Sequence, residues 1–269
     1  MLLEQYIFEV LNMRDESSIS SLANYLNSNR EELKNLIWDN DPWEIGVEEM
    51  DRLDDFILRG NRNLKYLAQG LHRRVYTLPG EEWILKVSTS QSGITANKGE
   101  VEIGAGKHGL GAKGILNKIF DYDKLEGNEA LWTISHKVIP LLAINDLNVL
   151  KKAFPTFWSM LREDEVTKKS AESFRKMISG VVQWFGIVLK YFSDGGDAKR
   201  AFYDAAKKCE YDCVDFEDVI FYKDFEKISQ AYAYIGANDM GGENFGLESL
   251  TNPSPESIVY FDFGPDFHF

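Results

Sequence analysis

The sequence is poor in cysteine, in long apolar runs and in basic leader features. Cys209 and Cys213 are the only cysteines among 269 residues, and no second cluster of cysteine or histidine completes a tetrahedral zinc site. No apolar run approaches the roughly 20 residues of a membrane span. The acids Glu4 and Glu9 stand where a signal peptide has a basic end. These absences argue against a zinc site and a membrane partner, and they predict reduced thiols in a cytoplasmic protein.

Positive charge is also scarce. The chain has 30 Lys and Arg against 43 Asp and Glu, which gives a formal net charge of −13. Nucleic-acid binding draws much of its affinity from Lys and Arg that displace counterions from phosphates, so we expect no direct nucleic-acid partner. An acidic surface could attract a basic protein, although many globular domains are equally acidic without such a role.

Helical spacing dominates the first 60 residues. Between Ser18 and Ile37, two short apolar-faced segments flank a turn at Asn27–Asn29, an arrangement that resembles a helix-turn-helix. The acids of this region outnumber its bases, which argues against a helix that enters a DNA groove. We therefore interpret residues 1–62 as a helical extension that packs on the rest of the protein.

The hydrophobic period changes from helical to alternating near Leu64. One helix candidate, over 97–107, interrupts a series of strands, and helical spacing returns between 142 and 235. Two more short strands are expected near the end of the sequence. Five strands with one helix after the third predict a sheet followed by a mainly helical region. The five strand candidates cover 64–70, 73–78, 82–88, 118–122 and 131–139.

Four polar residues occur in an order that suits phosphoryl transfer. That reaction needs a cation for the nucleotide phosphates, oxygen ligands for magnesium and a carboxylate beside the acceptor hydroxyl. Lys86 lies in an apolar strand, Asp239 and Asn244 have D-x-x-x-x-N spacing, and Asp262 opens a D-F-G. Each short match recurs by chance, and a strand lysine is usually solvent-facing. The order and context of the four residues favour the functional interpretation.

With these motifs in this order, the chain resembles the protein-kinase-like superfamily, and most of all the short early Ser/Thr protein kinases of T7-like bacteriophages. Residues 70–76 are similar to their nucleotide loop and residues 84–87 to their lysine strand. The resemblance implies an α+β fold of two lobes that follows the helical extension. Residues 63–140 would form a five-stranded antiparallel sheet plus helix. Residues 141–269 would form a reduced helical lobe without an activation segment or late helices.

The resemblance also implies roles for the residues around the nucleotide. Lys86 would contact the α- and β-phosphates of ATP and pair with an acid of the following helix. Glu100 fits that role best, and Glu102 is the second choice. The remaining nucleotide contacts would come from the loop, the second strand and the adenine hinge, namely Gly70, Val75, Val138 and Ile139.

Catalysis and metal binding are assigned in the same way. Asp239 would be the catalytic carboxylate, and Asn244 with Asp262 would hold Mg²⁺. Among the departures from the protein-kinase pattern, two concern residues expected near the phosphates. The loop has Gly70 alone where protein kinases usually have three glycines, and Gly241 stands where Ser/Thr kinases carry a lysine.

These implications predict an ATP- and Mg²⁺-dependent phosphotransferase, of the phage Ser/Thr protein kinase type, that modifies host proteins in the host cytoplasm. Two alternatives stay open. A small-molecule kinase or nucleotidyl transferase would share the same core. An acidic pseudokinase would bind and inhibit a host protein, but it would not need Lys86, Asp239, Asn244 and Asp262 together.

Overall fold

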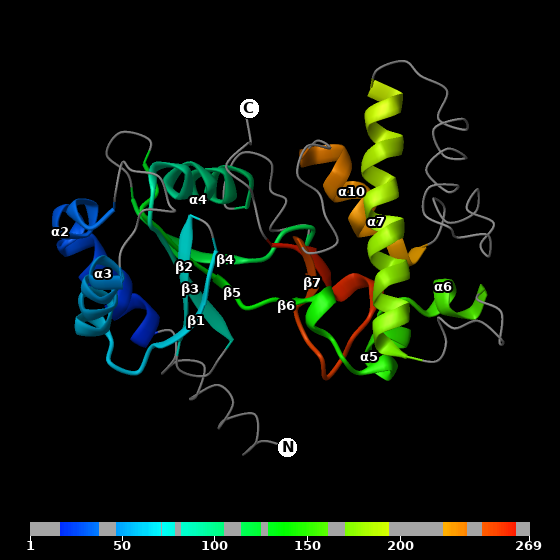
Figure 1. Cartoon of the computed structure of the whole chain (residues 1–269), viewed down its shortest axis with the longest axis horizontal. Helices are drawn as coiled ribbons and strands as arrows, with labels where there is room; N and C mark the ends of the chain where they lie inside the picture. Colours follow the sequence, from blue (N-terminus) through cyan, green and yellow to red (C-terminus); the bar gives the residue numbers. More distant parts are fainter. Residues whose placement is uncertain are drawn as a thin grey trace. The chain divides into compact units, whose positions relative to one another are not determined.

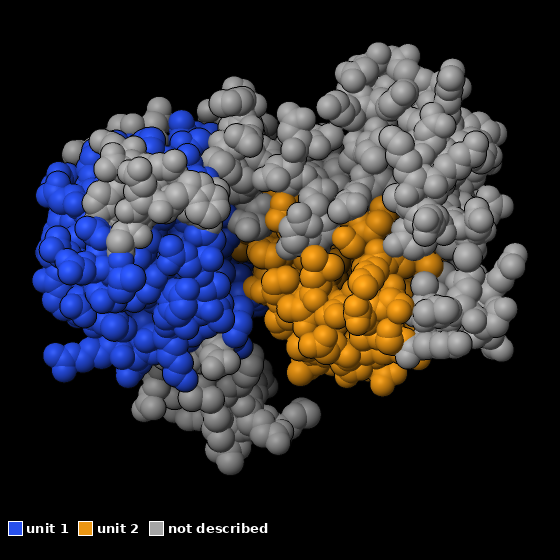
Figure 2. All heavy atoms as spheres, viewed as in Figure 1, with its two compact units in different colours: residues 1–108, 118–137 blue, residues 109–117, 138–269 orange. Residues whose placement is uncertain are grey.

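The chain divides into two compact units, which Figure 2 colours separately. Unit 1 comprises residues 1–108 and 118–137, and unit 2 comprises residues 109–117 and 138–269. The three domains expected from the sequence, with boundaries at 62 and 140, stay a prediction. The structure, a computed structural model, describes residues 17–37, 47–70, 72–78, 82–104, 114–124, 129–160, 170–193, 223–235 and 244–261.

Unit 1 is built on a five-stranded antiparallel sheet with the strand order β1-β2-β3-β5-β4 (Figure 1). This confirms the predicted α+β class and the five-stranded sheet. Successive side chains of a strand point to opposite faces, so Leu85 and Val87 share one face while Lys86 points to the other. The strands β1 to β5 span Lys65–Gln69, Arg73–Thr77, Trp83–Ser88, Ile119–Tyr122 and Trp132–His136.

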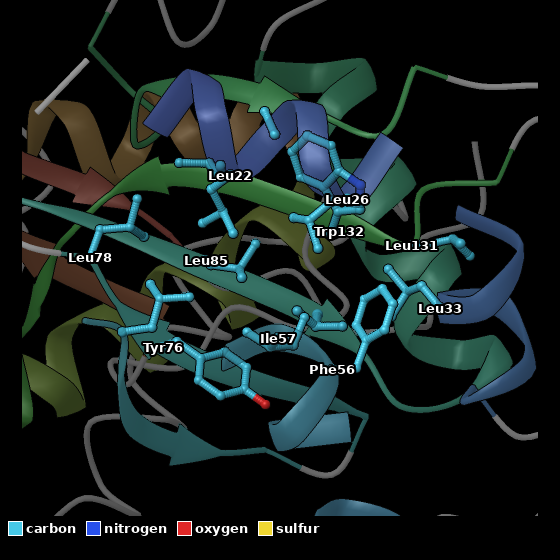
Figure 3. Close-up of a cluster of buried hydrophobic side chains, with 14 of the residues drawn as sticks. Leu22, Leu26, Leu33, Phe56, Ile57, Tyr76, Leu78, Leu85, Leu131 and Trp132 are labelled. Carbon is cyan, nitrogen blue, oxygen red and sulfur yellow. The ribbon is translucent and has the colours of Figure 1, made fainter. Parts of the chain in front are cut away.

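The face that carries Leu85 packs on the amino-terminal helices. These comprise a helical stretch over residues 17–28, α2 (Arg30–Asn35) and α3 (Val47–Gly60). Because their apolar residues recur at helical intervals, each helix presents one apolar stripe to the sheet. Figure 3 shows the resulting core, whose completely buried members include Leu22, Leu26, Leu33, Phe56, Ile57, Leu85 and Trp132.

This packing involves the residues of the helix-turn-helix pattern. In a separate DNA-binding domain, the apolar face of the second helix would pack against the other helices of that domain. Here that face packs in the core beside the sheet, where Leu33 is completely buried. The basic residues of α2 also face carboxylates of unit 1. Arg30 Nε donates to Asp123 Oδ1 over 3.0 Å, and Lys34 Nζ donates to Glu129 Oε2 over 2.8 Å. The described part of this segment therefore packs within unit 1.

Helix α4 (Gln91–Gly104) follows β3 and packs against β3, β4 and β5. It begins six residues before the predicted start at Asn97, because Ser90 caps it. The Ser90 hydroxyl accepts the Gly93 amide over 3.3 Å, and the Ser90 carbonyl accepts the Ile94 amide over 3.1 Å. A Cβ atom at Gly93 would lie 2.1 Å from the carbonyl oxygen of His72, so the glycine permits the close approach of helix and strand.

Unit 2 contains a three-stranded sheet of order β6-β7-β8 and several helices. The predicted strand over 131–139 ends early, at His136, and Ile139 pairs with Leu247 of β7 instead. A group of phenylalanines, including Phe154, Phe157 and Phe225, fills the described core. The elements are β6 (Ile139–Pro140), α5 (Leu147–Ala153), α6 (Pro155–Met160), α7 (Ala171–Ser193), α10 (Glu226–Ile235), β7 (Phe245–Leu247) and β8 (Ile258–Tyr260). Within the described ranges of this unit, short 3₁₀ helices cover Leu141–Ala143, Lys223–Phe225 and Pro255–Ser257.

Among the described residues, no helix combines the length and the apolar character that crossing a membrane requires.

Candidate functional site

Lys86 occupies the middle of β3 and joins it to helix α4. Val75 of β2 and Thr133 of β5 lie opposite it in the two strand pairings. Its side chain is only 5% exposed, and its Nζ donates to Oε1 of Glu100 over 2.7 Å. The structure thus brings together Lys86 and Glu100, the pair that the family resemblance implied. Their role in nucleotide binding stays a prediction.

Glu102, the second choice for this pairing, lies elsewhere on the helix. Its side chain is 46% exposed, and its Oε1 is 3.7 Å from Nζ of Lys98 one helical turn earlier. Residues two positions apart project from different sides of a helix. The buried position at Glu100 therefore excludes the same role for Glu102.

Two residues that the sequence did not single out also belong to the site around Glu100. Arg73, on β2, donates from Nη1 to the same Oε1 over 2.6 Å. Asn97, one turn before Glu100, donates from Nδ2 to the Ser88 hydroxyl over 2.8 Å and to the Ala130 carbonyl over 3.2 Å. The i, i+3 spacing of Asn97 and Glu100 was the available signal, because such residues share a helix face.

The electrostatics of Glu100 follow from its two cations. Burial alone raises the pKa of this carboxyl, but the charges of Lys86 and Arg73 and their hydrogen bonds lower it more strongly. The net pKa lies below the ordinary value of 4.5. Glu100 is therefore a buried carboxylate that stays ionised at neutral pH.

The depressed pKa makes a pH-dependent contribution to stability. A group whose pKa is lower in the folded state stabilises the protein above its unfolded pKa, and this contribution disappears as the pH falls through the folded pKa. The difference in unfolding free energy between the natural chain and Glu100→Gln should therefore be constant above about pH 4.5 and shrink at lower pH. Urea titrations of both chains between pH 3 and pH 7 measure this difference in unfolding free energy. A difference that stays unchanged at the acid end would contradict the assignment.

The other predicted nucleotide contacts of unit 1 lie near the same strands. Gly70 is exposed, and its amide donates to the Arg73 carbonyl over 2.9 Å, which closes a short turn between β1 and β2. Val75 lies across from Lys86. Thr133 and Ser135 of β5 lie on the same sheet face as Lys86. Their hydroxyls are buried and have no hydrogen-bond partner in the part of the chain that the structure describes. Such groups are candidates for bonding to water or a ligand.

The predicted metal and hinge residues belong to unit 2. Asn244 is buried, and its carbonyl accepts the amide of Phe261 over 3.0 Å at the end of the β7–β8 hairpin. Val138 and Ile139 are the first residues of unit 2 after β5. Asp239 and Asp262 lie outside the described residues, within which no group of three or more His, Cys, Asp or Glu could hold a metal ion.

Comparisons with known proteins bear on this geometry only weakly. No protein-family model and no curated protein matches the chain. A solved structure described as the GDP and kanamycin complex of APH(2")-IIia is similar over 80% of this chain and 75% of that chain, with 13% sequence identity and a TM-score of 0.31. At this level of similarity, neither the family nor the activity of that protein extends to this chain.

Proposed function

We propose that this protein is a nucleoside triphosphate-dependent phosphotransferase in which Lys86 binds the nucleotide phosphates. The buried pair of Lys86 and Glu100, 2.7 Å apart, carries the proposal. In protein kinases a lysine of the third strand pairs with a glutamate of the following helix, and this pair must be in place for phosphoryl transfer. Here the two residues come from β3 and from the helix that follows it.

A purely structural role is the competing explanation for this pair. Buried ion pairs are expensive to desolvate, and apolar residues of similar volume often stabilise a protein as well or better. Apolar residues at positions 86 and 100 could fill the same volume without that cost, since both side chains are almost completely buried. A lysine at position 86 is better explained by a need for positive charge, which a compact ammonium supplies to phosphates.

Unit 2 would supply the rest of the reaction centre. Asp239 would orient the acceptor hydroxyl and accept its proton, while Asn244 and Asp262 would hold Mg²⁺ through hard oxygen atoms. The support for the metal pair is that the Asn244 carbonyl bonds to Phe261, the residue before Asp262. The ion would neutralise negative charge on the nucleotide phosphates. Val138 and Ile139 would contact the adenine through backbone groups.

The acceptor is proposed to be a hydroxyl group of a host protein, as the resemblance to phage Ser/Thr kinases implies. A small-molecule hydroxyl is the alternative acceptor. Incubation of the purified chain with labelled ATP, Mg²⁺ and a bacterial extract distinguishes the two, because label would appear either on proteins or on low-molecular-weight products.

The proposal predicts that Lys86→Met weakens Mg-ATP binding roughly tenfold to a hundredfold, the range expected for the loss of a charged hydrogen bond. Arg73 still contacts Glu100 in this variant, so the buried carboxylate keeps a cation and the fold should survive. Isothermal titration calorimetry measures the affinity, and circular dichroism checks the fold.

Lys98→Met is the matched control, because Lys98 lies on α4 and pairs with the exposed Glu102. Its affinity for Mg-ATP should equal that of the natural chain. The proposed function is wrong if the natural chain binds neither Mg-ATP nor Mg-GTP, or if Lys86→Met binds as tightly as the control.

A further inference from the structure

The carboxylate of Glu100 is held from two strands at once. Lys86 of β3 and Arg73 of β2 both donate to its Oε1, over 2.7 and 2.6 Å. The two cationic nitrogens therefore lie within about 5 Å of each other on one face of the sheet. The other oxygen, Oε2, is buried and has no hydrogen-bond partner among the described residues. Two donors from neighbouring strands restrict the position of Oε1 more than a single donor would.

The helix that carries Glu100 is fixed by a second set of contacts. Asn97 is completely buried and donates to Ser88 at the end of β3 and to the Ala130 carbonyl before β5. Its Oδ1 also lies 3.5 Å from Nη1 of Arg73, at the outer limit of a hydrogen bond. Buried polar groups bonded in this way allow few alternative arrangements, because an unmade bond in the interior is costly.

We propose that Arg73, supported by Asn97, is a positioning residue that fixes Glu100 and, through it, orients the Lys86 ammonium toward the nucleotide phosphates. The inference rests on the proposed function of Lys86. It also explains how a nucleotide loop with a single glycine, Gly70, can serve. The cation is positioned from the sheet and the helix, so the loop backbone has less to contribute.

Arg74 provides a matched control for Arg73. The two arginines are adjacent on β2 and therefore point to opposite faces of the sheet. Arg74 also pairs with a helix carboxylate, since its Nε donates to Asp54 Oδ1 of α3 over 2.6 Å. Removing either arginine breaks an ion pair between strand and helix, but only Arg73 contacts the acid bound to Lys86.

The test measures the dissociation constant of Mg-ATP for Arg73→Gln, Arg73→Lys and Arg74→Gln in the full chain. Arg73→Gln should raise it roughly tenfold, the scale on which outer partners act when they orient a ligating group. Arg73→Lys should recover part of this loss because it restores a donor to Glu100, and Arg74→Gln should change the constant less than about twofold. Equal weakening by the two glutamine variants, or none by Arg73→Gln, would overturn the inference.

A double variant separates positioning from direct contact. In a Lys86→Met background, Arg73→Gln should add less than about a twofold loss, because its effect passes through Lys86. A full tenfold loss in that background would mean that Arg73 binds the phosphates itself, and the positioning role would be wrong.

Hydrogen exchange tests the same contact without nucleotide. Amides of α4 around Glu100 should exchange faster in Arg73→Gln than in the natural chain, and at the natural rate in Arg74→Gln. Failure of the natural chain to bind nucleotide would overturn the proposed function. Unchanged α4 exchange in Arg73→Gln would overturn the positioning role itself, so the two failures are distinguishable.

Discussion

Replacing Glu100 with glutamine should lower the free energy of unfolding by about 3–5 kcal/mol, the usual cost of removing one partner of a buried ion pair. Glu100 is 1% exposed, and its Oε1 accepts hydrogen bonds from both Arg73 and Lys86. Glutamine preserves the volume and one acceptor oxygen but removes the negative charge that the two buried cations share. Urea unfolding at neutral pH, followed by circular dichroism, measures the change.

Glu102→Gln is the control for this experiment. It makes the same chemical change two residues further along α4, where the side chain is 46% exposed and its lysine partner is 3.7 Å away. Surface ion pairs of this kind contribute little, so the change should stay within about 0.5 kcal/mol. Similar losses in the two variants, or a loss below about 1 kcal/mol in Glu100→Gln, would show that the cluster does not stabilise α4.

The five-stranded sheet could be predicted from the sequence because its strands alternate in polarity and its turns carry strong signals. The third strand illustrates this, since the Pro79-Gly80 pair in the sequence predicts a turn before it and Lys86 has apolar residues on both sides. Because this strand is buried from Ile84 to Ser88, its one charged residue needs a partner. Because neighbouring residues of a strand point to opposite faces, the alternation alone assigns Lys86 to the face opposite Leu85.

The start of α4 could not be predicted in the same way. Residues 91–96 contain Ser92, Gly93 and Thr95, which are poor helix formers and indicate a loop. The tertiary structure overrides this preference, because the Ser90 cap satisfies an amide at the helix start and Gly93 is required by the carbonyl of His72. A local pattern cannot reveal a close approach between segments that are distant in sequence.

The contact of Arg73 with Glu100 was missed for a related reason. A residue at the first position of a strand is usually near the surface, and the sequence does not state which helix face meets the sheet. Once Lys86 is known to pair with Glu100, the face of α4 that meets the sheet is also known. Asn97 then falls on it by spacing, whereas Arg73 follows only from the register in which Val75 lies opposite Lys86.

Replacing Asp239 with asparagine should lower the rate of phosphoryl transfer on the order of 100- to 10,000-fold, the usual contribution of a general base that also orients the acceptor. Mg-ATP affinity should change little, because the proposed role of Asp239 is to contact the acceptor hydroxyl and not the nucleotide. Single-turnover assays with labelled ATP measure the rate, and calorimetry measures the affinity.

Asp146→Asn is a suitable control in the same unit. Asp146 caps α5 by accepting the Asn148 amide over 2.8 Å, and asparagine caps helices about as well as aspartate. Both the transfer rate and the stability of this variant should match those of the natural chain. A transfer rate that is equal in Asp239→Asn and in the control would remove Asp239 from the reaction.

The Asp239→Asn variant also separates catalysis from capture of a host protein. An acidic pseudokinase would act by occupying a partner, so its cellular effect would survive both Asp239→Asn and Lys86→Met. It would instead depend on charge, and neutralising acids within residues 1–60 should abolish it because surface complementarity steers and holds a basic partner. A phosphotransferase gives the opposite pattern, in which the active-site variants lose the effect and the surface variants keep it. The unaltered fold of Lys86→Met, expected from the remaining pair of Arg73 and Glu100, makes the comparison interpretable.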